Sequence, residues 1–100
     1  MPELCVTLLC PPAIEENLLD LLLMSSATSV FTSTPTAAHG VDHGRLSPME
    51  QVLGRAHAVQ VQVIVPEADK APLLDALREQ FSKTGLRYWV TPILEAGEFE

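Results

Sequence analysis

Apolar and polar residues alternate most regularly over residues 57–65. Valines at every second position there point to one face of an extended chain, and the residues between them point to the other. This pattern is typical of a strand in an antiparallel sheet with one buried face. Three further segments are rich in apolar or β-branched residues and are bounded by a proline or a glycine. The predicted strands cover residues 4–10, 28–34, 57–65 and 87–94.

Two other segments repeat apolar residues with the period of a helix. In the first, which begins near Pro12, Glu16 and Asp20 mark the polar side opposite the apolar stripe. The second is predicted over residues 68–83, with a late start, because Pro72 is tolerated only in a first turn. The apolar stripes comprise Ile14, Leu18, Leu21 and Leu22 in the first helix, and Leu73, Leu74, Leu77 and Phe81 in the second.

The predicted elements follow the order β-α-β-loop-β-α-β, which is that of the α+β ferredoxin-like fold, βαββαβ. Right-handed crossovers in both halves place the two helices on one face of a four-stranded antiparallel sheet. We expect a single domain over residues 1–100, with a long flexible loop between strands two and three at about residues 37–56. Within that loop, residues 47–53 are compatible with a short helical turn.

Two helices on one side leave the opposite face of the sheet without a helical cover. Because the valines of the third strand face the helices, Gln60, Gln62 and Ile64 lie on the uncovered face. The first strand contributes either Cys5, Thr7 and Leu9 or the alternate set. A semi-polar face of this kind suits burial in a symmetric oligomer. The alternative is that it faces water.

The formal charge of −7, with only six Lys and Arg residues, excludes the clustered basic face that nucleic acids and anionic membranes require. No apolar run reaches the ~18–20 residues of a membrane-spanning helix. The acidic start lacks the basic region of a secretory signal. Cys5 and Cys10 are five residues apart on one strand, so they face opposite sides and do not pair. We therefore expect a cytoplasmic protein with reduced thiols and no direct membrane insertion.

One segment concentrates candidate metal ligands. His39, Asp42 and His43 lie within five residues and are flanked by glycines that let the backbone fold them toward one ion. Imidazole and carboxylate groups suit copper, zinc or nickel, with a fourth ligand from a neighbouring subunit, the acidic tail or water. The spacing matches no standard zinc motif, and a solvated loop is the alternative reading.

The remaining reactive or aromatic residues favour packing over catalysis. His57 is expected to pack at a strand edge. Tyr88 and Trp89 are adjacent on a strand and must face opposite sides, with Trp89 expected in the core. The chain has neither a Gly-x-Ser-x-Gly elbow nor a Walker loop, and no cation adjoins its cysteines. We therefore expect a protein that is not an enzyme.

The chain resembles the PII/CutA superfamily, and more specifically the small PII-like proteins of unknown function associated with heavy-metal efflux pumps of the resistance-nodulation-division type. The resemblance covers nearly the whole chain and depends on the order and spacing of short motifs. These are Leu-Leu-Cys-Pro at 8–11, Phe-Thr-Ser at 31–33, His-Gly at 39–40, Glu-Gln-Val-Leu-Gly-Arg at 50–55, Tyr-Trp-Val-Thr-Pro at 88–92 and Gly97.

The resemblance implies a homotrimer, with a ligand cleft between neighbouring subunits and long loops that contact a membrane efflux transporter. It places the partner contact on Gly40, Gly44, Glu50, Gln51 and Gly54. Signalling PII proteins bind adenine nucleotides through a Gly-Asp-Gly-Lys type of turn. This chain has Thr-Gly-Leu-Arg at 84–87 instead, which offers few N–H groups for a phosphate and makes nucleotide binding doubtful. The candidate residues for binding an anion are Arg45, Arg55 and Arg87.

The leading interpretation is a trimeric PII-like regulatory protein whose loop senses a transition metal or another small ligand and acts on a heavy-metal efflux transporter. The alternative is a CutA-like metal-tolerance protein that binds metal without a signalling role. A third reading, a small-molecule enzyme on a dimeric ferredoxin-like fold, would need a catalytic acid or base in a closed cleft, and the sequence offers only the loop histidines.

Overall fold

The computed structural model describes residues 2–25, 30–40, 47–53 and 55–99. Within these ranges the chain forms four strands, three α-helices and two short 3₁₀ helices. The strands are β1 (Glu3–Cys10), β2 (Phe31–Ala38), β3 (Ala56–Pro66) and β4 (Arg87–Ile93). The helices are α1 (Glu15–Met24), α2 (Pro48–Leu53) and α3 (Lys70–Phe81), with η1 (Pro12–Ile14) before α1 and η3 (Glu67–Asp69) before α3.

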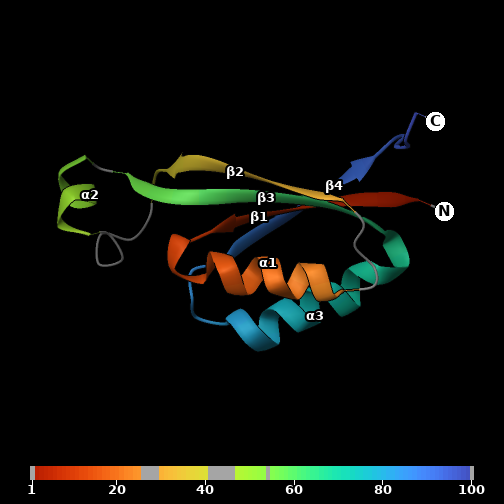
Figure 1. The fold of residues 1–100 in the computed structure, drawn as a ribbon, viewed down its shortest axis with the longest axis horizontal. Helices are drawn as coiled ribbons and strands as arrows, with labels where there is room; N and C mark the ends of the chain where they lie inside the picture. The colour runs from red at the N-terminus through yellow and green to blue at the C-terminus, as the bar shows by residue number, and fades with distance from the viewer. Residues whose placement is uncertain (1, 26–29, 41–46, 54, 100) are drawn as a thin grey trace.

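All four strands form one antiparallel sheet in the order β2-β3-β1-β4. Helices α1 and α3 lie side by side against one face of this sheet (Figure 1). The predicted ferredoxin-like βαββαβ fold, with both helices on one face, is therefore confirmed. β2 and β3 continue beyond the other strands and carry α2 at their far end (Figure 1).

The boundaries of β2 differ from the sequence-based prediction. The strand runs four residues beyond the expected end at residue 34, and residues 28 and 29 lie outside the described ranges. Pro35 does not end it, because β2 is an edge strand and can accommodate a residue without an N–H. The segment between β2 and β3 is correspondingly shorter than predicted, and its expected helical turn at 47–53 is α2.

The core lies between the helical layer and the sheet. Leucines of α1 and α3 pack on alternate residues of the two central strands, which removes a continuous apolar surface from water. Both Pro12 and Pro72 lie in first turns, as predicted, where a missing N–H costs no helical hydrogen bond. The buried cluster comprises Val6, Leu8, Cys10, Leu18, Leu22, Val59, Val61, Val63, Val65, Leu73, Leu77 and Phe81.

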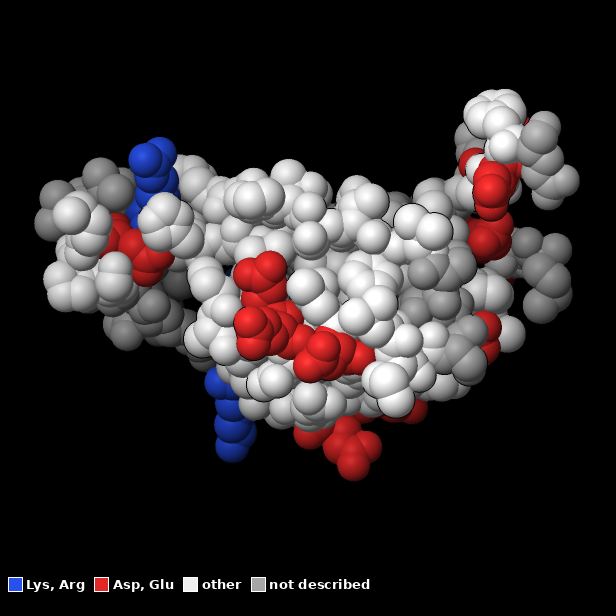
Figure 2. Space-filling model, viewed as in Figure 1, with Lys and Arg blue, Asp and Glu red and all other residues white. Residues whose placement is uncertain are grey.

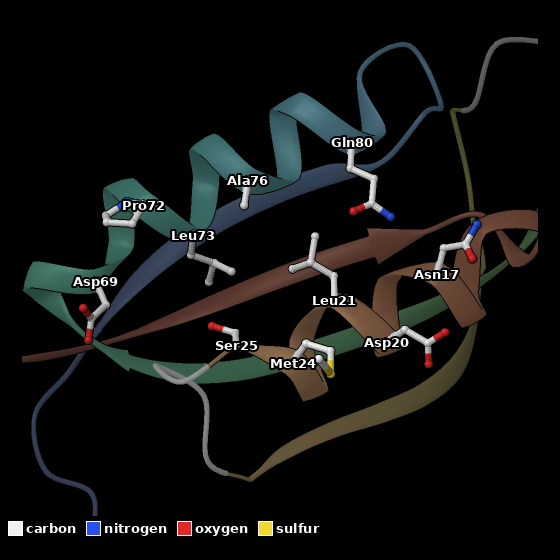
Figure 3. Close-up of a pocket in the computed structure, with 10 residues that line it drawn as sticks. All are labelled: Asn17, Asp20, Leu21, Met24, Ser25, Asp69, Pro72, Leu73, Ala76 and Gln80. Atoms are coloured by element: carbon white, nitrogen blue, oxygen red, sulfur yellow. The ribbon is translucent and has the colours of Figure 1, made fainter.

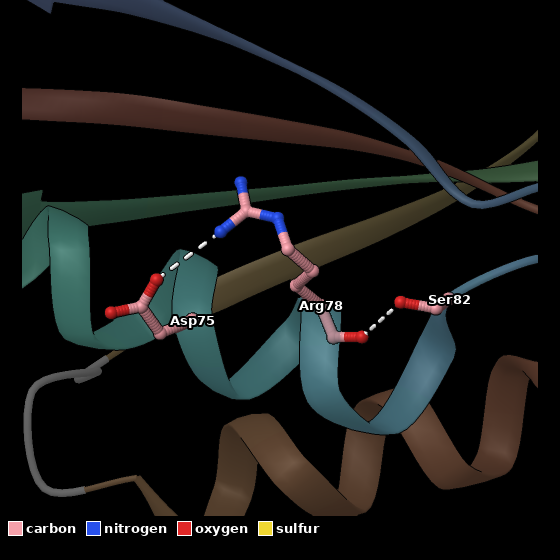
Figure 4. A network of polar contacts seen from close by, with 3 residues as sticks. All are labelled: Asp75, Arg78 and Ser82. Atoms are coloured by element: carbon pink, nitrogen blue, oxygen red, sulfur yellow. Dashed lines mark hydrogen bonds and ion pairs between the residues drawn. The ribbon is translucent and has the colours of Figure 1, made fainter.

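A tight turn reverses the chain between α3 and β4. Lys83 has a positive φ of 65°, and the Thr84 N–H donates to the Phe81 carbonyl over 3.3 Å. On the last turns of α3, Arg78 forms an ion pair with Asp75 at 3.2 Å, and the Ser82 hydroxyl donates to the Arg78 carbonyl (Figure 4). The Ser82 and Thr84 hydrogen bonds lie at the end of the helix, which is close to the predicted position, and β4 then runs back along β1.

Candidate functional site: the uncovered face of the sheet

In the described part of the chain, no helix covers the sheet face opposite α1 and α3 (Figure 1). Residues paired directly across antiparallel strands point to the same face, so the strand register defines the rows of side chains there. On β3 this face carries Gln60, Gln62 and Ile64, as predicted. They lie opposite Leu9, Thr7 and Cys5 of β1, which is the first of the two sets that the sequence left open for that strand. The central part of the open face is the following set: Thr32, Gln62, Thr7 and Trp89 in the central row, Thr34, Gln60, Leu9 and Arg87 on one side, and Ile64, Cys5 and Thr91 on the other.

The open face is largely uncharged. Arg87 is the single charged residue of this central part, and the others are apolar or neutral polar; Glu3 lies on the same face at the end of β1, opposite Pro66 and Ile93. Thr7 is only 2% exposed and lies between the larger Gln62 and Trp89 in the central row. Trp89, directly opposite Thr7, remains 45% exposed. A half-exposed tryptophan on a largely uncharged surface is typical of the core of a protein interface.

The structure corrects the expected position of Trp89. The prediction placed it in the core, but register pairs it with Thr7 on the open face, and Tyr88 takes the helical side opposite Leu8. Tyr88 is itself half exposed beside Phe81 and Leu86, because β4 is an edge strand. Adjacent strand residues must face opposite sides, but sequence alternation alone does not say which residue faces the helices.

The predicted metal ligands are only partly described. His39 is exposed and directly follows β2, whereas Asp42 and His43 lie outside the described residues. Residues in the described ranges form no group of three His, Cys, Asp or Glu side chains able to hold a metal ion. His57 lies on β3 with an exposed side chain. A metal centre built on this loop therefore stays a prediction.

Glu50 has a role that sequence reasoning missed. Its carboxylate accepts the Ser47 N–H at 3.0 Å and the His57 N–H at 2.7 Å, while its own N–H donates to Ser47 Oγ at 3.2 Å. These backbone hydrogen bonds hold the pKa of Glu50 below its ordinary value of 4.5. Ser-Pro-Met-Glu at 47–50 is a capping box, so the signal was present in the sequence. Glu50, predicted as a partner contact, thus joins α2 to the start of β3.

The remaining predicted partner residues lie near this joint or outside the described ranges. Gly40 has a φ of +77°, a left-handed conformation that favours glycine. Gln51 belongs to α2. Gly44 and Gly54 lie outside the described residues.

The two predicted anion-binding arginines that the structure describes, Arg55 and Arg87, are not gathered in one place in a single chain. Arg87 is exposed on the open face and shares its row with Leu9 and Gln60. Arg55 precedes Gln60 by five residues, which corresponds to ~17 Å along an extended strand. Arg45 lies outside the described residues. An anion held by both Arg55 and Arg87 would thus require a second subunit.

A family model described as "Protein of unknown function (DUF3240)" matches residues 1–100. A DUF3240 family protein from Shewanella baltica OS155 has a similar structure, with a TM-score of 0.81 and 21% identity over 98% of this chain and 97% of that one. No curated protein matches the sequence. No helix in the described part of the chain is long and apolar enough to cross a membrane.

Two other solved structures share the fold at lower identity. A protein of Thermus thermophilus described as PII-like signalling aligns with a TM-score of 0.67 and 19% identity, over 93% of this chain and 88% of that one. The periplasmic divalent cation tolerance protein CutA from Archaeoglobus fulgidus aligns with a TM-score of 0.72 and 14% identity, over 96% and 88%. At these identities the similarity establishes the fold.

Proposed function

Because the chain belongs to the DUF3240 family and has the fold of PII-like and CutA proteins, we propose that it is a homotrimeric regulatory protein without enzymatic activity. The observation that carries this proposal is the open face, a largely uncharged surface centred on the half-exposed Trp89. Sister copies cover these faces, and the segment between β2 and β3 projects from the assembly toward a partner.

Self-association is favoured by the contrast between the two sides of the sheet. A chain of net charge −7 repels its own copies at acidic surfaces. The central part of the open face lacks acidic residues, so two copies can approach there without that cost. A domain of 100 residues also has a small core, and covering Trp89 and Leu9 adds apolar burial that one chain cannot supply.

The direct test is the mass of the native protein in solution, measured by light scattering after gel filtration. The proposal predicts about three times the 10.9 kDa chain mass at micromolar concentration. A mass of one chain would contradict it, because the open face would then face water. A dimer would leave the face covered but would remove the threefold arrangement.

We further propose that the projecting segment senses a transition metal, through His39 with Asp42 and His43. Support comes from the donor chemistry of these side chains and from the proximity of His39 to the end of β2, a rigid anchor. Calorimetric titration with copper(I), zinc and nickel tests this. A heat that disappears in the His39→Ala and His43→Ala variants, but persists in the control His57→Ala, supports the site. Equal heats in all variants would remove it.

A second possibility that we propose for the sensed ligand is an anion bound between subunits. Its ligands would be Arg45, Arg55 and Arg87 of neighbouring chains. The separation of Arg55 from Arg87 within one chain favours a site shared across an interface. Adenine nucleotides are disfavoured, because the turn at 84–87 has one glycine. Titration with ATP and with inorganic phosphate separates the two: phosphate heats lost in Arg87→Gln support the anion site, and their persistence contradicts it.

The partner we propose is a heavy-metal efflux transporter, with the protein acting from the cytoplasm. The alternative is a CutA-like metal-tolerance protein, which the similarity to the divalent cation tolerance protein favours. A regulator changes the order of its projecting segment when metal binds, whereas a metal-tolerance protein does not. Limited proteolysis of the segment at residues 39–55 with and without metal distinguishes them: altered cleavage supports the regulator, and unchanged cleavage with bound metal supports the alternative.

A further inference from the structure

A groove of about 650 Å³ runs between α1 and α3 on the outer side of the helical layer (Figure 3). Each wall is one stripe of a helix, with residues spaced three or four apart. Leu73 is buried at its base, and the small side chain of Ala76 leaves room across from Leu21. The volume falls within the ~300–1,000 Å³ that is usual for ligand pockets.

Helix α1 is more apolar than its contact with the sheet requires. Leu18 and Leu22 are completely buried and account for the core-facing stripe. Leu23 is nevertheless 70% exposed and Met24 87% exposed at the C-terminal end of the helix. Met24 lines the groove, and its flexible thioether can adapt to more than one packing arrangement.

The rim of the groove is acidic. Asp20 on α1 and Asp69 before α3 both line it, and the described lining residues include no Lys or Arg. Helix α1 has three acidic residues and no basic one, and acidic atoms gather over it in Figure 2. On α3, Arg78 is paired with Asp75 at 3.2 Å. An apolar floor with an acidic rim is complementary to a partner that is apolar on one side and cationic at its edges.

We propose that this groove docks a cationic amphipathic helix of a partner protein. The walls span residues 17–24 of α1 and 69–80 of η3 and α3, or ~10–17 Å at 1.5 Å per residue. Two to three turns of a helix fit that length, with apolar anchors at i, i+3, i+4 and i+7. A second copy of this chain is disfavoured as the occupant, because its charge of −7 and its acidic tail would meet an acidic rim.

The proposal goes beyond the oligomeric function and does not depend on it. The groove lies on the helical layer, whereas self-association uses the opposite side of the sheet. Covering the open face with sister copies therefore leaves one groove per chain for a different protein.

The test uses isotope-labelled full-length protein and a synthetic 14-residue peptide with leucines at i, i+3, i+4 and i+7 flanked by lysines. A matched peptide carries glutamates in place of the lysines. Chemical shifts of the amides in 17–24 and 69–80 should move with the lysine peptide only. Replacing Asp20 and Asp69 together by Asn should weaken binding about 2- to 10-fold and reduce its salt dependence, as expected for exposed charges.

Two variants in which an alanine of α3 is replaced by leucine test where the peptide binds. Ala76→Leu fills the groove and should abolish the shifts, whereas Ala71→Leu, on an exposed position outside it, should leave them unchanged. Both substitutions keep a strong helix former. Absence of lysine-peptide binding at 1 mM, equal binding of the glutamate peptide, or undiminished binding to Ala76→Leu would overturn the proposal. So would a change in the native mass of Ala76→Leu, since the occupant would then be a second copy.

Discussion

Replacing Trp89 by alanine should dissociate the assembly. A tryptophan side chain buries ~150–250 Å² when fully enclosed. With 45% of Trp89 still exposed in the single chain, about 70–110 Å² per chain is left for a sister copy to cover. At ~25 cal/mol per Å² this area contributes about 2–3 kcal/mol per chain, or about 5–8 kcal/mol per trimer.

The concentration at which a trimer is half dissociated varies with the square root of its dissociation constant. At about 1.4 kcal/mol per factor of ten, the loss of Trp89 should raise that concentration by ~10²- to 10³-fold. Sedimentation velocity over a dilution series measures the shift. Leu23→Ala is the matched control, because it removes an exposed apolar side chain from the opposite layer.

If Trp89→Ala keeps a native far-ultraviolet circular dichroism spectrum and its half-dissociation concentration is unchanged, the assignment of the open face to self-association is refuted. An equal shift in Leu23→Ala would refute it as well, because the effect would then not depend on the side of the sheet.

The remaining predictions concern the core, the joint at α2 and a thiol. Leu22→Ala should lower the free energy of unfolding by about 2–5 kcal/mol, and Leu23→Ala by less than ~0.5 kcal/mol; equal losses in urea unfolding would contradict the packing of α1. Glu50→Ala should shift the His57 amide resonance. Because the pKa of Glu50 is depressed in the folded protein, the stabilisation by its carboxylate is complete above pH 4.5 and is lost as the pH falls through the folded-state pKa. A His57 amide resonance that does not change on acidification would contradict the hydrogen bond between Glu50 and His57. Burial, with Glu15 nearby, raises the pKa of Cys10 to about 11, so iodoacetamide at pH 8 should modify it only in urea; rapid modification of the folded protein would contradict this.

Periodicity predicted the two-layer architecture because the positions that face the core obey it. The valines of β3 alternate, and the leucines of α1 repeat at helical spacing, so each element identifies its own buried side. Two residues escaped this reasoning for different reasons. Trp89 depends on strand register, which is a tertiary property. Glu50 carries a local capping signal that was read as a partner contact.

The candidate chemistry was less accessible from the sequence than the fold. The metal prediction rests on residue types in a segment with no periodic pattern, and only His39 of its three ligands falls among the described residues. The groove between α1 and α3 depends on how two helices pack side by side. The only indication of this groove in the sequence is the excess of apolar residues at the end of α1.

Trp89 is the only tryptophan in the chain, so its fluorescence reports directly on the surface that sister copies are proposed to cover. In concentrated native protein, acrylamide should quench it weakly, and the emission should lie toward the blue. Stepwise dilution should raise quenching and shift emission to the red at the same concentration at which the mass decreases to one chain. Strong quenching at every concentration, with the mass constant, would mean that the open face meets water and that the assembly is built elsewhere.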